Sequence, residues 1–556
     1  MNQSPHDRHW LGLSIAFWHV VACLALAVLT AATFSNALSN GFVSFDDWFL
    51  VEDNPRIHSL AWGNVARMFT HQSSGTWLPL RLLSYAVDYR LWGLLPLGYH
   101  LTNVAFHMAN VLLAYAVLSW LLRRPALALL GAAWFAVHPV QVESVTWVSG
   151  RRDVQYAFFF LLSLLAFLAS ERREGRSRWV FYGLSLACLL ASLLSKAAAM
   201  TLPGVLVLAV LLFGTEGDTT RRRLLATVPH WVLAVGIALV HYLVARSAEV
   251  VKEPAFTSGV ANLPLVFGKY WQLLLFPVHL ATPHGYGALQ WSDPAPGILL
   301  SAAVVVVVAL AWWAAPRKHV ALFCAGWWFL LLLPVSNLLP LSVLVAERYM
   351  YLPVLGACAL GADIVGSLAS RRRAVVIACA VGVLALLAAA TYHRNRVWEN
   401  GKTFWKDSVS RWPGMPVARI GLACEYREGN QLEKSWRQYM MIALAGGRAA
   451  SRGDEHVKLV STGLERCYER LAREREAEGR KAATLDVYET VVRLMPQKIE
   501  PRVRLAQAYE RMGMPAKARE QVLAIQGMAP EHPGLAEWLR RLEEAPEDVG
   551  GQAQKE

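Results

Sequence analysis

Charged residues are scarce in this sequence of 556 residues: Asp, Glu, Lys and Arg together make up 17%, against about a quarter in an average soluble protein. Apolar residues make up 55%, and nearly all of the surplus falls in residues 10–392, whereas the last part of the chain is polar and charged. This imbalance argues against a soluble enzyme. It is typical of a polytopic membrane domain that is followed by a soluble tail.

Two other classes of protein are disfavoured by what is missing. No two cysteines have the CxxC spacing, and five of the seven lie in apolar runs, so neither a zinc site nor a disulfide scaffold is indicated. The net charge of +13 comes mostly from arginines in short clusters between apolar runs, and no basic surface with interleaved aromatic residues stands out. We therefore expect no nucleic-acid partner and interpret the clusters as signals of orientation in a bilayer.

Eleven apolar segments are candidates for membrane helices. They are 11–34, 97–122, 126–148, 154–170, 179–194, 197–213, 228–246, 297–314, 320–335, 350–367 and 374–391. Basic connections near residues 8, 123–124, 172–178, 221–223, 317–318 and 371–373 all fall on one side if every segment crosses once. Since short basic loops mark the cytoplasm, the N-terminus is expected inside and the C-terminal tail outside.

The stretch 179–213 decides part of this topology. As one helix its 35 residues would measure about 52 Å, well beyond a hydrocarbon core of about 30 Å. We therefore predict a hairpin that turns at Ser195–Lys196 and keeps Lys196 near the outer face. The first segment is too long for the apolar part of an ordinary signal peptide, so we expect it to be a retained helix.

The first outer connection contains the sequence GFVSFDDWFLVEDNP, which places two adjacent carboxylates, Asp46 and Asp47, among aromatic and apolar residues. Adjacent carboxylates repel each other, so a cation or a proton is expected to hold them together. The alternative is a solvated turn in which Asp53 or Asn54 caps a helix.

A second polar cluster, HPVQVESVTWVSGRRDVQ, puts His138 and Glu143 inside what would otherwise be an ordinary span, followed directly by Arg151, Arg152 and Asp153. Ionisable groups at membrane depth are unfavourable unless they line a polar cavity or pair with each other. This pattern favours a cavity open to the outside. The alternative is an Arg–Asp pair that anchors two helices at the interface.

Two more outer segments carry ionisable residues. Lys196 stands alone between apolar helices, where extension of its amine to the outer headgroups is the alternative to a functional role. The segment VSNLLPLSVLVAERYMYLP places Glu347, Arg348, Tyr349 and Tyr351 at the mouth of a helix, where an interfacial anchor with aromatic residues is the alternative. Together, four separate connections bring carboxylates, arginines and a lysine to one face of one membrane domain.

From residue 418 the pattern changes to helical repeats that fit the tetratricopeptide template. Two copies are clear and an earlier one is degenerate, with an irregular insert at 446–465. Such arrays bind extended peptides through a concave face, although packing against the membrane domain remains an alternative. The matching positions are Leu505, Ala506, Tyr509, Gly513, Ala518, Val522 and Pro530; Leu471, Ala472, Gly479, Tyr488 and Pro496; and Leu422, Ala423, Tyr426, Asn430, Ser435 and Tyr439.

The order of these features resembles the transmembrane and tetratricopeptide-repeat O-mannosyltransferase family, which are membrane glycosyltransferases of the GT-C fold. The stretches GFVSFDD, WLPLRLLSYAVDYRLWG, HPVQVESVTWVSGRRD, LLSKAAAMTLP and VAERYMYLP carry the resemblance, which covers almost the whole chain. Relatives often have an acidic residue after the lysine, where this chain has Ala197. The tail is also shorter than in animal members, so the choice of acceptor does not transfer.

The resemblance implies an all-α, polytopic GT-C helical bundle with about 11 membrane helices, and an enzyme that moves a sugar from a polyprenyl phosphate to an acceptor hydroxyl with inversion. Asp46 or Asp47 would be the general base, with Asp46 preferred. The donor phosphate would be held by Arg151, Arg152, Lys196 and Arg348. Supporting roles would fall to His138, Glu143, Asp153, Glu347, Tyr349 and Tyr351. No cofactor is assigned, and the need for a divalent metal stays open because no clear ligand set is present.

These inferences define a domain plan: a catalytic membrane domain at 1–391, a connector at 392–417, a repeat domain at 418–543 and a disordered end at 544–556. The expected partners are a polyprenyl-phosphate sugar, an acceptor protein bound by the repeats, and the lipid bilayer. The expected location is a bacterial inner membrane with a periplasmic tail. Two alternatives remain: transfer to a lipid or surface glycan, and a non-enzymatic membrane scaffold for envelope or secretion assembly. A transporter is disfavoured, because its ionisable residues would lie near the bilayer midplane.

Overall fold

The structure is a computed structural model of the whole chain, and it describes most of its residues. These are 9–10, 13–72, 76–214, 218–247, 256–278, 280–282, 306, 309, 313, 317–336, 338, 343–369, 372–446 and 455–544. The chain divides into two compact units, Met1–Phe404 and Trp405–Glu556, which are treated separately below. The predicted segment 297–314 lies largely outside the described residues, so its structure is not discussed.

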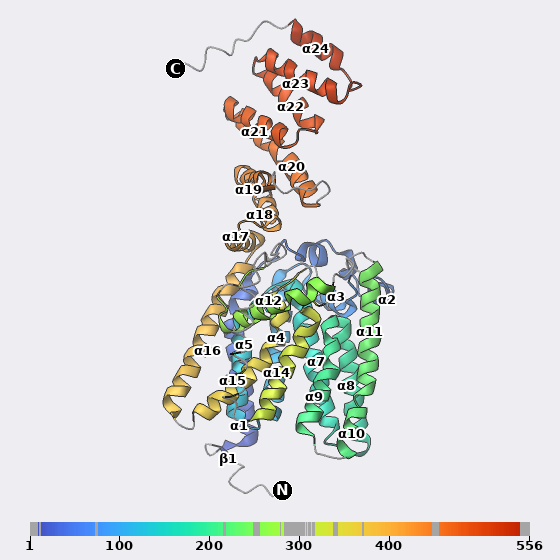
Figure 1. Ribbon diagram of the computed structural model, residues 1–556, viewed down its shortest axis with the longest axis vertical. Helices are drawn as coiled ribbons and strands as arrows, with labels where there is room; N and C mark the ends of the chain where they lie inside the picture. Colours follow the sequence, from blue (N-terminus) through green and yellow to red (C-terminus); the bar gives the residue numbers. More distant parts are fainter. Residues whose placement is uncertain are drawn as a thin grey trace. The chain divides into compact units, whose positions relative to one another are not determined.

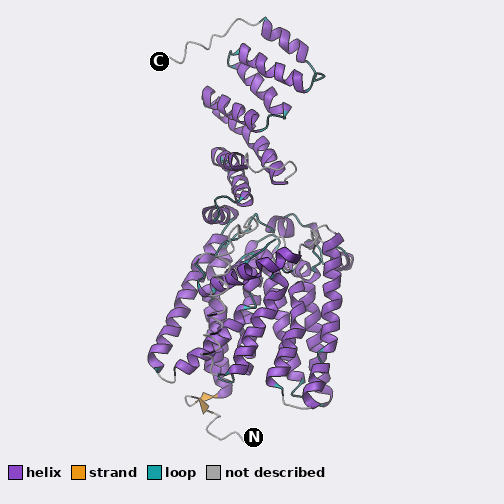
Figure 2. Ribbon diagram, in the orientation of Figure 1, coloured by secondary structure: helices purple, strands orange, loops and turns teal. Residues whose placement is uncertain are grey.

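The first unit is a helical bundle (Figure 1), and the described residues are helical almost throughout (Figure 2). A short antiparallel pair, β1 (His9–Trp10) and β2 (Leu13–Ser14), precedes the bundle. The helices are α1 (Ile15–Thr33), α2 (Trp62–Thr70), α3 (Pro79–Trp92), α4 (Pro96–Leu122), α5 (Pro125–Val137), α6 (Val142–Thr146), α7 (Arg151–Ser170), α8 (Gly175–Ser195), α9 (Leu202–Phe213), α10 (Asp218–Leu225), α11 (Val228–Ser247), α12 (Phe256–Leu275), α14 (Lys318–Leu332), α15 (Val354–Leu368) and α16 (Arg373–Asn395).

Seven of the described helical stretches are long and apolar enough to cross a membrane, or eight if the bent pair 125–137 and 139–146 forms one span. Two shorter apolar helical stretches, Ala197–Phe213 and Val354–Leu368, match two more of the predicted segments. The all-α, multi-pass character of the chain is thus confirmed, while the number of eleven spans stays a prediction.

The apolar segment 126–148 is not one straight helix, in line with the polar residues that interrupt it from His138 onward. Helix α5 ends at Val137, and the chain bends by 51° before it continues as α6. The reason is local: His138 precedes Pro139, and a residue before proline is pushed out of the helical region, here to φ −69° and ψ 130°. Residues 138–150 therefore form short turns and a one-turn helix that fold into the protein.

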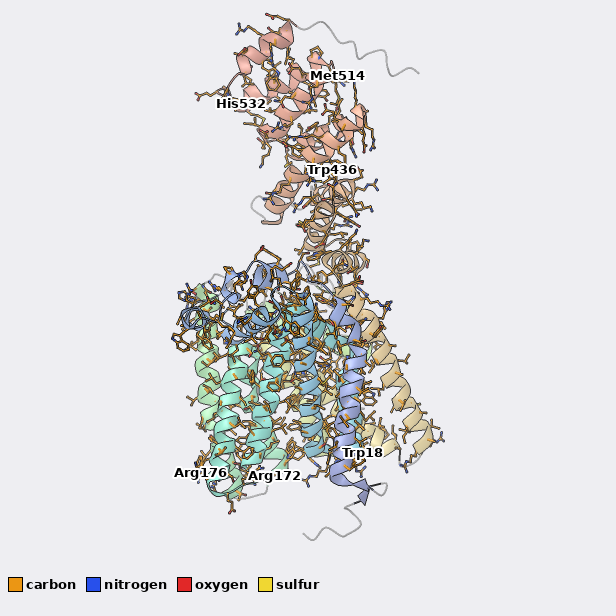
Figure 3. All side chains as sticks on the ribbon, turned by 180° about the vertical axis from the view of Figure 1, so that it is seen from behind. Trp18, Arg172, Arg176, Trp436, Met514 and His532 are labelled. Carbon is orange, nitrogen blue, oxygen red and sulfur yellow. The ribbon has the colours of Figure 1, made fainter. Side chains whose placement is uncertain are left out.

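The basic connections gather at one end of the bundle. Arg223 and Arg178 reach the same Glu171 carboxylate, at 3.0 and 3.5 Å, and Arg317 donates to the Leu122 carbonyl at 2.7 Å. Figure 3 shows Arg172 and Arg176 at this end, where α7 turns into α8. Because α7 starts and α8 finishes at the opposite end, Arg151 and Lys196 are separated from the basic connections by the length of the bundle.

The first outer connection is folded rather than loose. Its short helical turns and the helices α2 and α3 enclose a small core that includes Leu50, Ile57, Met68, Tyr85 and Tyr99. The Tyr85 hydroxyl donates to the Val148 carbonyl at 3.0 Å, which joins this core to the segment before α7. The predicted capping role at Asp53 or Asn54 belongs to Asn54, whose side chain accepts from the Arg56 amide at 3.1 Å. The connection therefore holds Asp46 and Asp47 in a defined place.

The second unit consists of successive helices in antiparallel pairs, with Trp436 on α19 (Figure 3). Leu422, Leu471 and Leu505 and the alanines that follow each of them are buried at equivalent places. The turns within the pairs use Asn430, Gly479 and Gly513, all with positive φ, which glycine and asparagine tolerate best. These observations fit the predicted repeats, whose assignment as tetratricopeptide repeats stays a prediction. The helices are α17 (Gly401–Arg411), which crosses the unit boundary, α18 (Pro416–Glu428), α19 (Leu432–Gly446), α20 (Glu455–Ala477), α21 (Lys481–Leu494), α22 (Ile499–Arg511), α23 (Pro515–Met528) and α24 (Leu535–Glu543).

Candidate active site

The two adjacent aspartates of the first outer connection have different environments. Asp47 is fully buried, and its carboxylate accepts hydrogen bonds from the Val43 amide at 2.9 Å and from the Ser149 amide at 3.0 Å. The Ser149 hydroxyl is a third donor to the same carboxylate. Asp46 is half-buried, and within the described part of the chain no hydrogen bond or ion pair to its carboxylate is recorded. Asp47 therefore fastens the connection to the segment before α7, while Asp46 keeps its oxygens available.

The pKa values of both carboxyls are shifted upward. Burial raises the pKa of Asp46, although the positive charges of Arg152, Arg348 and Arg81 act to lower it. Burial also raises the pKa of Asp47, to about 7, against the three hydrogen bonds that favour its ionised form. A general base works best when its pKa lies near the working pH, so the upward shift at Asp46 is in the useful direction.

Arg151 is enclosed by protein. Its guanidinium donates to Asp88 at 2.6 Å and to the Tyr99 carbonyl at 2.9 Å, and also to Asn103 and Ser84. Four of the five N–H groups that a guanidinium carries are thereby used, and the side chain is 0% exposed. These contacts join α7 to α3 and α4, while the predicted contact of Arg151 with the donor phosphate stays a prediction.

Arg152 and Lys196 share one buried carboxylate. Lys196 forms an ion pair with Asp153, and the Arg152 Nε lies 3.7 Å from the other Asp153 oxygen. The Lys196 ammonium also lies 5.1 Å from the centre of the Tyr156 ring and 5.5 Å from that of Tyr349. The predicted turn at Lys196 brings its side chain to the start of α7, because α8 runs antiparallel to α7.

Arg348 and Glu143 form a buried pair. The Arg348 guanidinium donates to one Glu143 oxygen, and its backbone amide donates to the other at 2.7 Å. The guanidinium carbon also lies 5.7 Å from the centre of the Trp147 ring and 5.2 Å from that of Tyr349. Glu143 thus holds both the side chain and the backbone of Arg348 in place, and its supporting role in a reaction stays a prediction.

The other predicted supporting residues hold the surrounding structure. The Tyr351 hydroxyl is bonded to His107 at 2.7 Å and to Asn110 at 2.9 Å. Glu347 is buried, with Arg394 at 4.0 Å. His138 accepts from the Val140 amide at 3.3 Å, and its Nε2 lies 3.1 Å from the Leu274 carbonyl. Tyr351 therefore packs inside the bundle instead of forming an interfacial belt.

An aromatic cluster backs the connection that carries Asp46. The Phe45 ring packs on Trp147 and Phe404, with centroid separations of 5.3 and 5.6 Å. Trp398 completes the cluster, at 5.7 Å from Trp147 and 4.8 Å from Phe404. The first residues after α16 thus belong to the packing around the candidate site.

Asn395, at the end of α16, makes hydrogen bonds to several other segments in the same region. It accepts from Thr146 at 2.8 Å and donates to the Thr33 carbonyl at 3.0 Å and to Asn36 at 2.9 Å. Its own carbonyl accepts from Asn40 at 3.1 Å. The helix expected to finish at residue 391 therefore continues and ties α1 to α6.

An apolar pocket of about 210 Å³ lies between α12, α14 and α15. Its walls include Trp271, Trp328 and Phe329, and Leu274 lines the end where His138 reaches the Leu274 carbonyl. Among the residues that the structure describes, no group of three His, Cys, Asp or Glu side chains could hold a metal ion.

Arg81, on α3, is a site residue that the sequence reasoning missed. It is 3% exposed, and its charge acts on Asp46. Burial lowers the pKa of Arg81 to about 10, with a further lowering from Arg152. The signal was present as a polar stripe, since Arg81, Tyr85 and Asp88 occupy one face of a helix at spacings of four and three residues.

Comparison with known proteins supplies relatives for this arrangement. No family model matches the chain. Protein O-mannosyl-transferase Tmtc3 of Drosophila melanogaster is 31% identical over 218 residues, which is 33% of this chain and 23% of that protein. Protein O-mannosyl-transferase TMTC3 of Homo sapiens is 24% identical over 437 residues, which is 69% of this chain and 47% of that protein.

The chain is thus similar in sequence to these protein O-mannosyl-transferases. It spans less than half the length of either of them. Among solved structures, an archaeal oligosaccharyltransferase AglB from Archaeoglobus fulgidus matches 75% of this chain and 59% of its own, with 11% identity and a TM-score of 0.42. ArnT from Cupriavidus metallidurans, bound to undecaprenyl phosphate, matches 88% of this chain and 81% of its own, with 17% identity and a TM-score of 0.38.

Proposed function

We propose that this chain is an inverting membrane glycosyltransferase of the GT-C type, which moves a sugar from a polyprenyl phosphate to a hydroxyl of a protein acceptor. The observation that carries the proposal is the Asp46 carboxylate: it has no recorded partner among the described residues and is subject to the charges of Arg152, Arg348 and Arg81. The sequence relatives, which are protein O-mannosyl-transferases, support the same reaction class.

The proposed chemistry is a single displacement. Asp46 takes the proton of the acceptor hydroxyl as its oxygen attacks the anomeric carbon, and the bond between that carbon and the phosphate oxygen breaks. The electron pair of this bond stays on the lipid phosphate, which gains one negative charge. Fixed cations near the leaving phosphate stabilise that charge because they need no reorganisation. Attack from the face opposite the phosphate inverts the anomeric configuration.

The surroundings fit a lipid-linked donor. The apolar pocket between α12, α14 and α15 suits a hydrocarbon chain, and Leu274 at its edge is bonded to His138, a few residues from Glu143. We further propose that the site faces the outside, because the basic connections gather at the other end of the bundle. On this proposal the N-terminus lies in the cytoplasm of a bacterium, and the repeat unit lies in the periplasm, where it would bind the acceptor protein.

The test uses the purified full-length chain in lipid nanodiscs with a panel of polyprenyl-phosphate sugars. Wild-type protein should release or transfer sugar from at least one donor, and Asp46→Asn should lower kcat by about 10²–10⁴, the usual contribution of a general base. Asp53→Asn is the matched control, because Asp53 is an exposed aspartate of the same connection. Equal transfer by wild type and Asp46→Asn would contradict the role of Asp46 as the base, and no release or transfer by either protein would favour a non-enzymatic scaffold.

The acceptor class is tested separately. Deletion of the gene should leave a protein without its glycan if the acceptor is a protein. Accumulation of an unmodified glycolipid instead would mean that the same site serves a lipid or a surface glycan.

A further inference from the structure

The guanidinium of Arg81 is almost completely buried, yet it has no recorded hydrogen bond anywhere in the described part of the chain. Its side chain is 3% exposed, and its Nε is shielded from solvent without a partner. A buried charge without partners is strongly unfavourable, so native proteins pair such groups or place them against a ligand. Asp46 and Asp153 supply negative charge within electrostatic reach but no hydrogen bond to Arg81, so the position calls for a hydrogen-bond acceptor that the described residues do not provide.

Arg151 shows what a structural buried arginine looks like in the same region. It is as buried as Arg81, but its guanidinium donates to Asp88, Asn103, Ser84 and the Tyr99 carbonyl. The two side chains thus differ in hydrogen bonding and not in burial. Folding alone accounts for Arg151, and it does not account for Arg81.

Arg152 shares the unusual feature of Arg81. Its Nε is shielded from solvent without a hydrogen bond, 3.7 Å from an Asp153 oxygen that belongs to the ion pair with Lys196. The charges of Arg152, Asp46 and Asp153 all act on Arg81, so these groups lie within electrostatic reach of one another. Repulsion between the two guanidinium groups opposes this arrangement unless negative charge lies near both.

The local balance of charge indicates which anion fits. Lys196 is neutralised by Asp153, and Arg348 is neutralised by Glu143. This leaves Arg81 and Arg152 against Asp46 and Asp47. Because burial raises the pKa of Asp47 to about 7, the excess is one positive charge when Asp47 is protonated. A phosphodiester carries one negative charge, and its two free oxygens match the paired N–H groups of a guanidinium.

We propose that Arg81 and Arg152 together form the contact that grips the donor phosphate, and that Arg151 only holds α7 against α3 and α4. The proposal deepens the proposed function and rests on it for the identity of the donor. It assigns a binding role to Arg81, a residue of the first outer connection outside the four cations named from the sequence.

The first test needs no donor and measures thermal unfolding of the full-length protein in nanodiscs. Arg81→Met removes a buried charge that has no hydrogen bonds, so the Tm should stay the same or rise. Arg151→Met strips four hydrogen bonds from its neighbours, so the Tm should fall clearly. Arg90→Met, at an exposed position on the same helix, is the matched control. A fall in Tm for Arg81→Met as large as that for Arg151→Met would overturn the proposal.

The second test measures binding of undecaprenyl phosphate and of inorganic phosphate to the same proteins. Wild type should bind the lipid, and Arg81→Met or Arg152→Met should weaken binding by about tenfold to a hundredfold, as expected for charge-assisted hydrogen bonds. Competition by inorganic phosphate at millimolar concentration would mean that the protein recognises the phosphate headgroup alone. No competition would mean that the hydrocarbon tail of the lipid is also needed. Either result supports the contact if lipid binding depends on Arg81.

Two further outcomes separate this inference from the proposed function. Undecaprenyl phosphate that binds wild type and Arg81→Met equally would refute the role of Arg81 even if the protein transfers sugar. Binding that depends on Arg81, in a protein that transfers no sugar from any donor, would support the anion contact and count against the transferase.

Discussion

Replacement of Asp46 and Asp47 by alanine should separate chemistry from local stability. Asp47→Ala leaves the Val43 and Ser149 amides buried without an acceptor, whereas the Ser149 hydroxyl can rotate to another partner. At about 1–3 kcal/mol for each orphaned donor, the connection should lose about 2–6 kcal/mol of local stability. Asp46→Ala removes no recorded hydrogen bond, and burial already disfavours the charge of Asp46, so its effect should stay within about 0.5 kcal/mol.

Hydrogen exchange followed by mass spectrometry measures this difference directly, because it reports the local opening free energy. In Asp47→Ala, peptides that cover residues 43–52 and 147–153 should exchange at least about thirtyfold faster than in wild type, which corresponds to about 2 kcal/mol. In Asp46→Ala the same peptides should exchange within about twofold of wild type, while sugar transfer is lost. Asp53→Ala controls for removal of an exposed carboxylate. The reasoning is refuted if both variants open the connection equally, or if Asp47→Ala leaves its exchange unchanged.

Three other predictions follow from single contacts. Burial raises the pKa of Asp47 to about 7, so the folded protein holds this proton more tightly than the unfolded chain. The free energy of unfolding should therefore fall as the pH rises from about 4 to about 7, by up to about 4 kcal/mol from Asp47. Thermal unfolding across this range should show a clearly shallower slope in Asp47→Asn than in wild type, with a remainder from Asp46. Glu143→Gln leaves the buried Arg348 without its counter-charge, so the free energy of unfolding should fall by about 3–5 kcal/mol and the Tm should fall with it. An unchanged Tm would contradict the buried ion pair. Gly513→Ala puts a Cβ on a turn residue with φ +75° and should destabilise the repeat unit by about 1–2 kcal/mol. Gly527 has open space around it and no positive φ, so Gly527→Ala should not destabilise the unit. Chemical denaturation of the full-length chain compares the two variants.

Much of the fold could be predicted from the sequence, because the features that specify each helix and turn are local in the sequence. Apolar runs predicted most of the described membrane helices, and helix length alone required the turn at Lys196. The departure from an ordinary span near His138 was indicated by the ionisable residues there, and the bend itself follows from the proline after His138. The repeats were predictable because small residues and turn residues recur at fixed spacing.

The candidate site could be predicted only in part, because the role of each side chain depends on contacts between segments that are distant in the sequence. Arg151 and Arg152 are adjacent in the sequence, but neighbours on a helix point about 100° apart, so one faces a protein network and the other does not. Asp46 and Asp47 differ for a related reason: two of the three donors to Asp47 belong to Ser149, about a hundred residues away. Arg81 was missed because its neighbours Arg152 and Asp153 lie on another helix.

The packing of Asn395, Trp398 and Phe404 bears on how the two units can be studied apart. A chain that stops at residue 391 would lack the Asn395 side-chain amide that joins Thr33, Asn36 and Thr146. It would also lack Trp398 and Phe404, two of the three rings packed with Phe45. An isolated membrane unit should therefore retain residues through at least Phe404. Loss of activity on truncation at 391 would then report damage to the membrane unit itself and would say nothing about whether the repeats recruit an acceptor.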